Sequence, residues 1–107
     1  MAHYLVRGKL IIGTDVELRQ KLAKQEFLKM RPFGKSLTQG LEGLRHDPKT
    51  DEVLWEEEDY CSPPLAMERA AVLDKYFDAI QVEKLPKDEG WERISELLAL
   101  WDDLPEP

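Results

Sequence analysis

The chain has 107 residues, with 15 basic and 22 acidic side chains and a formal net charge of −7. This length suits one core, and we expect a single domain over residues 1–104 with a frayed tail at 105–107. The acidic balance argues against binding to nucleic acid or to an anionic membrane, because both attract a net positive surface.

The charge is distributed unevenly along the chain. Residues 1–46 carry 9 basic and 4 acidic side chains, whereas residues 47–107 carry 6 and 18. We interpret the two halves as partners that attract each other within one fold. The alternative is an anion-binding patch in the first half, but its cations lack a glycine-rich phosphate loop and interleaved aromatic side chains.

The cysteine content and the N-terminus bear on the compartment. Cys61 is the only cysteine, so an internal disulfide is impossible and the chain fits a reducing cytosol. Arg7 and Lys9 interrupt the apolar N-terminal segment, which therefore does not resemble a signal peptide. No apolar run approaches the roughly 20 residues that span a bilayer. We predict a cytoplasmic protein.

Two elements are expected in the first third of the chain. Alternating apolar and polar residues predict a strand over 3–12. Thr14 and Glu17 have the spacing of a capping box, which marks the start of a helix. The side chains expected on its buried side are Leu18, Leu22 and Ala23.

A hairpin is expected around Asp47-Pro48, because Asp bonds to backbone amides and Pro fixes φ in turns. Its second arm is 52–56. For residues 36–45 we favour a strand, although the leucines there also fit helical spacing. Gly40 and Gly43 would each cost about 1 kcal/mol inside a helix.

The second half predicts a helix, a strand and a further helix. Ser62 is the expected N-cap of the first helix and Pro63 its first residue. Its expected core positions are Ala66, Ala70, Leu73 and Phe77. A strand around Ile80 and Val82 ends at Pro86. Asp88 then caps a helix whose expected apolar side is Trp91, Ile94, Leu98 and Trp101.

The resulting order is βαββαβ, which is typical of the ferredoxin-like fold of the α+β class. We expect an antiparallel sheet with the first and third strands adjacent at its centre. Both crossover helices should cover one face, and an extra helix should follow at the C-terminus. Because this fold supports many activities, it identifies no function.

The open face of this sheet is the first candidate working surface. Its expected residues on the two central strands are Leu5, Arg7, Lys9 and Ile11, and Leu54, Glu56, Glu58 and Tyr60. One interpretation is a solvated lattice of cations and carboxylates. The other is a surface for a homodimer, a protein partner or a small-molecule ligand, because apolar residues lie among the charges.

Glu57, Asp59 and Cys61 share the opposite parity and are the candidate reactive residues. Two carboxyls buried side by side raise one pKa, as an acid–base pair requires, but purely structural carboxylates are the simpler interpretation. Cys61 precedes a helix, where a thiolate is favoured. Free cysteine is also a common inert core residue.

The sequence predicts no metal and no cofactor. Strand residues alternate faces, so at most two carboxylates of 56–59 converge, and His3 and His46 match no zinc pattern. The leading hypothesis is a small binding domain acting through the open sheet face. The alternative is a small enzyme with an acidic or cysteine-based site near Glu57, Asp59 and Cys61.

Overall fold

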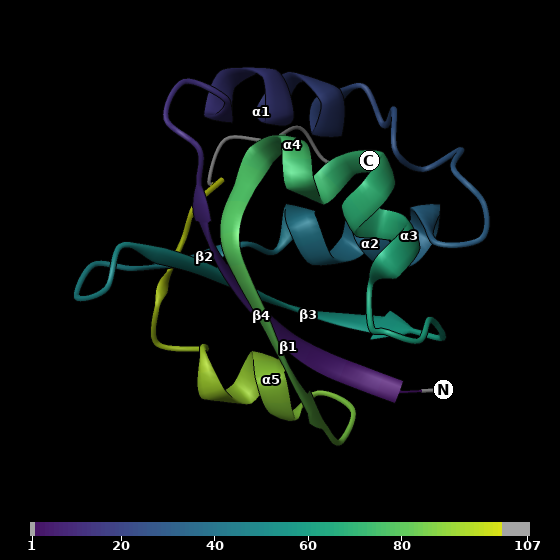
Figure 1. Ribbon diagram of the computed structural model, residues 1–107. Helices are drawn as coiled ribbons and strands as arrows, with labels where there is room; N and C mark the ends of the chain where they lie inside the picture. Colours follow the sequence, from purple (N-terminus) through teal and green to yellow (C-terminus); the bar gives the residue numbers. More distant parts are fainter. Residues whose placement is uncertain (1, 102–107) are drawn as a thin grey trace.

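One antiparallel sheet organises the computed structural model, which describes residues 2–101; the tail expected at 105–107 lies outside them. Its strands are β1 (Ala2–Leu10), β2 (Arg45–Asp47), β3 (Glu52–Asp59), β4 (Phe77–Leu85) and β5 (Leu98–Ala99). They lie in the order β4-β1-β3-β2-β5 (Figure 1). The α+β class is therefore confirmed.

One of the two longest pairings places β1 and β3 side by side, as predicted. Ala2 lies opposite Asp59 at one end and Gly8 opposite Val53 at the other. β4 pairs with the other edge of β1. β2 pairs only with residues 52–54, so among the described strands none covers the outer edge of residues 55–59.

Helical segments lie on both sides of the sheet. These are α1 (Asp15–Ala23), α2 (Gly34–Glu42), the consecutive α3 (Ala66–Glu68), π-helical η1 (Arg69–Leu73) and α4 (Asp74–Tyr76), and α5 (Glu89–Arg93). Figure 1 shows α1, α2 and the α3–α4 segment on one side and α5 on the other. The prediction of a sheet with one open face is therefore wrong.

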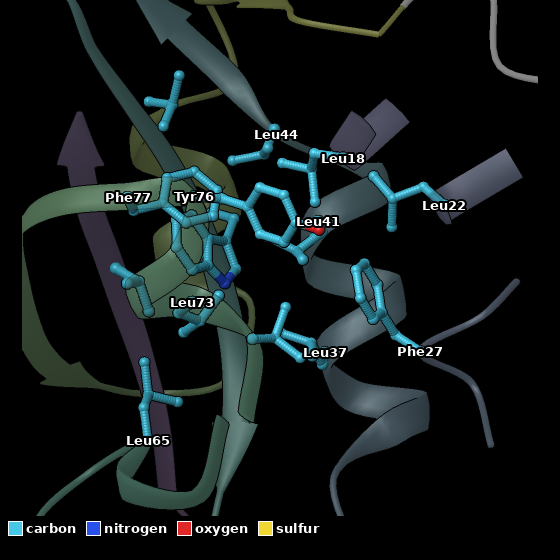
Figure 2. Packing of buried hydrophobic residues seen from close by; sticks show 14 of the residues in the cluster. Leu18, Leu22, Phe27, Leu37, Leu41, Leu44, Leu65, Leu73, Tyr76 and Phe77 are labelled. Carbon is cyan, nitrogen blue, oxygen red and sulfur yellow. The ribbon is translucent and has the colours of Figure 1, made fainter. Parts of the chain in front are cut away.

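The main core fills the space between the sheet and the helices on the first side. Trp55 of β3 is fully buried, and its ring lies 5.1 Å from that of Phe77 between centroids. Figure 2 shows leucines of α1 and α2 meeting Leu73 and Tyr76 from the helical segment that follows β3. This core fixes the direction in which the side chains of β3 point.

Residues 36–45 are mostly helical, and the strand expected there is wrong except for the short β2. A Cβ on Gly40 would lie 2.6 Å from the Trp55 ring, so glycine at this position lets α2 pack directly on β3. Burial of Leu37 and Leu41, both 0% exposed, offsets the helical cost of glycine. The hairpin between β2 and β3 is confirmed.

The long C-terminal helix is also wrong, because α5 ends at Arg93 and the chain then turns back to the sheet. Leu98 lies in β5, paired with His46, and is 81% exposed. β5 pairs with the outer edge of β2 and so supplies partners for backbone groups that an edge strand would otherwise leave unpaired. Trp101 then donates its indole N–H to the Leu41 carbonyl at 2.9 Å.

The first residues of two helical segments do not form the capping contacts that the sequence predicts. Thr14 occupies the N-cap position of α1, but its hydroxyl donates to the Ile11 carbonyl at 2.7 Å, so no capping box forms. The helical segment that follows β3 begins at Ala66, after Leu65 in the left-handed region at φ 63°, and not at Pro63. The expected core positions Ala23 and Ala70 are exposed.

Candidate functional site

The sheet face expected to be open is covered by α5. Leu5 and Leu54 are 3% and 8% exposed and form a second small core with Leu85 and Ile94. An exposed apolar patch at Leu5 and Leu54 is therefore ruled out, because burial under α5 removes it from water. Tyr60 and Lys9 are exposed, and the Arg7 guanidinium lies 3.9 Å from Glu83.

Glu56 is the side chain that fastens α5 to this face. Its Oε1 accepts hydrogen bonds from the backbone N–H groups of Gly90 at 2.8 Å and Trp91 at 3.2 Å. Its Oε2 accepts from the Asp88 N–H at 2.9 Å. The carboxylate is 5% exposed and fully partnered, so its role is structural.

Glu57 and Asp59 point to the helical side, as their parity predicts, and Glu68 of α3 joins them there. We call these three residues the carboxyl cluster; they are 2%, 4% and 0% exposed. The Trp55 indole N–H donates to Glu57 Oε1 at 2.9 Å, and the Leu65 N–H donates to Asp59 Oδ2 at 2.6 Å.

Three oxygens of the carboxyl cluster have no hydrogen-bond donor among the described residues. They are Glu57 Oε2 and both oxygens of Glu68. Burial raises the pKa of Glu57 well above its ordinary value, and the charge of Glu68 raises it further against the Trp55 hydrogen bond. Burial also raises the pKa of Glu68, together with the charge of Asp59. Two such carboxyls bond to each other only when one holds a proton.

Cys61 lies at the edge of the carboxyl cluster. Its sulfur and one oxygen each of Asp59 and Glu68 lie within 4.8 Å of one another. A backbone hydrogen bond from Met67 lowers the pKa of the thiol, but burial and the two carboxylates outweigh it and raise that pKa. A metal-free thiolate is therefore disfavoured. A cavity of about 30 Å³ is lined by these three side chains among others.

A larger hollow, which we call the β3 cleft, lies beside residues 56–58. It measures about 330 Å³ and is bounded by α2, the first residues of β1 and the segment leading into α5. The residues with polar groups or rings at its wall include His3, Lys35, Gln39, Glu58, Lys87 and Trp91. Ser36 and Glu58 line both this cleft and the small cavity next to Cys61.

The imidazole of His3 connects two carboxylates in the β3 cleft. Its Nδ1 lies 3.5 Å from Glu56 Oε2 and its Nε2 lies 3.3 Å from Glu58 Oε2. Of these two carboxylates, Glu56 is already occupied by backbone amides, so Glu58 is the one that can accept a ligand. Lys35 and Lys87 are exposed cations from two other chain segments.

A second hollow of about 460 Å³ lies at the other end of β1, bordered by Ile12 and Trp101. Its lining is more apolar, and it contains none of the residues singled out in the sequence as reactive candidates. It is separate from both the β3 cleft and the carboxyl cluster.

Sequence reasoning missed Glu68 and the cleft-lining residues His3 and Lys87, whereas Lys35 belongs to the anion-binding patch considered as the alternative for the first half of the chain. One sequence signal marks Glu68: it stands four residues before Val72 and eight before Tyr76, on the buried stripe of its helical segment. A carboxylate at such a position needs a partner. No comparable pattern marks the cleft residues, because they come from separate segments.

In comparisons with known proteins, no family model, no curated protein and no solved structure matches this chain. Over residues 2–101, none of the helices combines the length and the apolar composition that crossing a bilayer requires. The candidate function therefore depends on the geometry of the site alone.

Proposed function

We propose that the protein binds a small polar molecule in the β3 cleft. One observation carries this proposal: polar and charged side chains from β1, α2, β3 and the segment before α5 converge on a hollow of about 330 Å³. That size falls within the range of small-molecule sites. A binding site requires groups from several segments to converge on one place. A chance pair of surface charges requires only two side chains.

The charges of the cleft suggest the class of ligand. Lys35 and Lys87 suit an anionic group, while Glu58 accepts hydrogen bonds or pairs with a cation. Trp91 supplies an aromatic surface. A molecule with a carboxylate or phosphate at one end and an amino group at the other, such as an amino acid, matches this set.

A thermal-shift screen tests this proposal. Small carboxylates, phosphates and amino acids should include a compound that raises Tm, because a ligand of the native state alone stabilises it. Lys35→Gln and Glu58→Gln should each remove most of that rise. Lys49→Gln, an exposed lysine in the β2–β3 turn, is the matched control and should keep it. A rise that survives both cleft substitutions, or no rise with any compound, would contradict the proposal.

A second candidate function is enzymatic, and one observation favours it. The cavity beside Asp59, Cys61 and Glu68 shares Ser36 and Glu58 with the cleft, so a ligand there would lie next to the carboxyl cluster. A stabilising ligand would then be converted over time, as followed by NMR. Asp59→Asn should stop conversion and retain binding, because the amide oxygen can still accept the Leu65 N–H. If the ligand is recovered chemically unchanged from the wild type, the enzymatic candidate is contradicted and binding alone remains as the proposed function.

We further infer a ferredoxin-like sheet extended by β5. In the order β4-β1-β3-β2, β3 is inserted between β1 and β2, and β1 between β3 and β4, as a split βαβ arrangement requires. A cytosolic location stays a prediction from the single cysteine. A homodimer also stays a prediction, which light scattering would test, and it would need a surface other than the buried Leu5 and Leu54.

A further inference from the structure

The carboxyl cluster and Cys61 offer a set of metal ligands in a compact space. Asp59, Cys61 and Glu68 each present one ligand atom, and these atoms lie within 4.8 Å of one another. They come from the end of β3, the following loop and α3. The turn from the strand into the helix thus brings them to one point. An acidic cluster alone would not indicate a ligand, so a second observation is needed.

That observation is the unpartnered state of buried oxygens. Glu68 is 0% exposed, and neither of its oxygens receives a hydrogen bond from residues 2–101. Glu57 Oε2, on a side chain that is 2% exposed, also lacks a donor there. Burying an ionised carboxylate without a donor or a cation is strongly unfavourable. No Lys, Arg or His of the described residues forms an ion pair with these groups in the structure. A bound cation would compensate the Glu68 carboxylate directly.

We infer that Asp59, Cys61 and Glu68 bind one divalent transition-metal ion of the zinc class. Ca²⁺ and Mg²⁺ select oxygen ligands, whereas Zn²⁺ accepts a cysteine sulfur together with carboxylate oxygens. With metal–ligand distances of about 2.0–2.3 Å, the ligand atoms of a tetrahedral site lie about 3.3–3.8 Å apart. The three atoms, which lie within 4.8 Å of one another, would therefore move closer together by up to about 1 Å when the ion binds. This inference departs from the sequence-based expectation of no metal.

The surroundings of the three ligands suit such a site. The Leu65 N–H on Asp59 Oδ2 orients that carboxylate, as outer-shell donors do in metal sites, and leaves Oδ1 for the ion. The fourth position falls to Glu57 or to water, since the adjacent cavity of about 30 Å³ has room for one. Metal binding does not depend on a ligand in the β3 cleft, so the two proposals succeed or fail separately.

Titration of the full-length, reduced protein with Co²⁺ tests the inference. We expect saturation at one equivalent, with visible bands of a low-symmetry site, a sulfur-to-cobalt charge-transfer band, and displacement by Zn²⁺. Cys61→Ser should abolish the charge-transfer band. Glu68→Gln should weaken binding by more than the roughly 10- to 100-fold typical of an outer-shell loss. The exposed Glu92→Gln and the surface His46→Ala are controls and should bind as the wild type does.

Thermal melting provides a second readout. In chelator, Glu68→Gln should melt above the wild type because it removes an unpartnered charge. With excess Zn²⁺, the wild type should gain Tm and Glu68→Gln should not. Asp59→Asn replaces Glu68→Gln if the latter does not fold. Absence of saturable binding, or binding unchanged by both Cys61→Ser and the carboxyl substitution, would overturn the inference and leave a purely structural acid cluster.

Discussion

Glu56 and Glu57 are neighbours on β3, and they are 5% and 2% exposed, yet their surroundings are opposite. The Glu56 carboxylate receives three backbone N–H groups from the start of α5. The Glu57 carboxylate receives one indole N–H and faces the carboxyl of Glu68. Burial alone therefore does not determine the free energy of an ionised carboxylate. The hydrogen-bond donors and charges around it also determine that free energy.

The same difference separates the buried carboxylates on the two faces of the sheet. On the α5 side, the buried charge is satisfied and holds an element in place. On the helical side, the charge is left for a proton or a cation to compensate. Unpaired buried charge is costly, and proteins retain it mainly where it performs a task. Substitutions at buried carboxylates on each face, and at their neighbours, test this contrast.

Glu56→Ala should destabilise the protein by about 3 kcal/mol, because three N–H groups lose an ionised acceptor. Urea unfolding measures the loss. Glu58→Ala is the matched control, two residues along the same face with its side chain 30% exposed, and should change stability by less than about 0.5 kcal/mol. Equal effects of the two substitutions would show that the amide contacts of Glu56 contribute little.

Gly40→Ala should cost about 1–3 kcal/mol, because its Cβ would lie 2.6 Å from the Trp55 ring. Displacing that ring also disturbs the indole N–H, the single donor to Glu57. Gln39→Ala, exposed on the same helix, is the control and should stay within about 0.5 kcal/mol. Tryptophan fluorescence recorded with the unfolding curves would report the displacement. An unchanged stability would mean that α2 shifts without strain.

Glu57→Gln should act in the opposite direction to Glu56→Ala and stabilise the metal-free protein by about 1 kcal/mol. The amide oxygen keeps the bond from Trp55, while the new N–H₂ group gives Glu68 a donor. Urea unfolding in chelator measures the change, and Glu56→Gln is the comparison, expected to destabilise. If Glu57→Gln also destabilises, the two carboxylates are equally well compensated and the contrast between them fails.

Glu17→Gln should have the smallest effect, with a definite pH dependence. Hydrogen bonds from Tyr76 and then Lys75 lower the pKa of Glu17 below its ordinary 4.5. A lowered native pKa contributes stability above the unfolded value and loses it as pH falls through the native value. The Tm advantage of the wild type should therefore shrink below pH 4.5. Tyr76→Phe, which removes the main donor, should abolish most of this trend; a persistent trend would assign it to another group.

Local patterns predicted those parts of the fold that depend on neighbouring residues. Alternation with a period of two identified β1, β3 and β4. It also placed Glu57 and Asp59 on one face, because successive side chains of a strand point to opposite faces of the sheet. The Asp47 turn was predictable for a similar reason, since its side chain bonds to the amide of Lys49.

Contacts between distant residues decided the rest. Residues 36–45 became mostly helical because Gly40 packs on Trp55, and α5 covered the sheet because Glu56 meets amides more than thirty residues away. Glu68 joined Glu57 and Asp59 only when α3 packed on β3. Sequence patterns predicted β1, β3 and β4, the sides to which their residues point, and two of the three clustered carboxyls. The covered sheet face, the β3 cleft and the third carboxyl depend on tertiary contacts. Local sequence spacing does not show which distant groups pack around a buried charge.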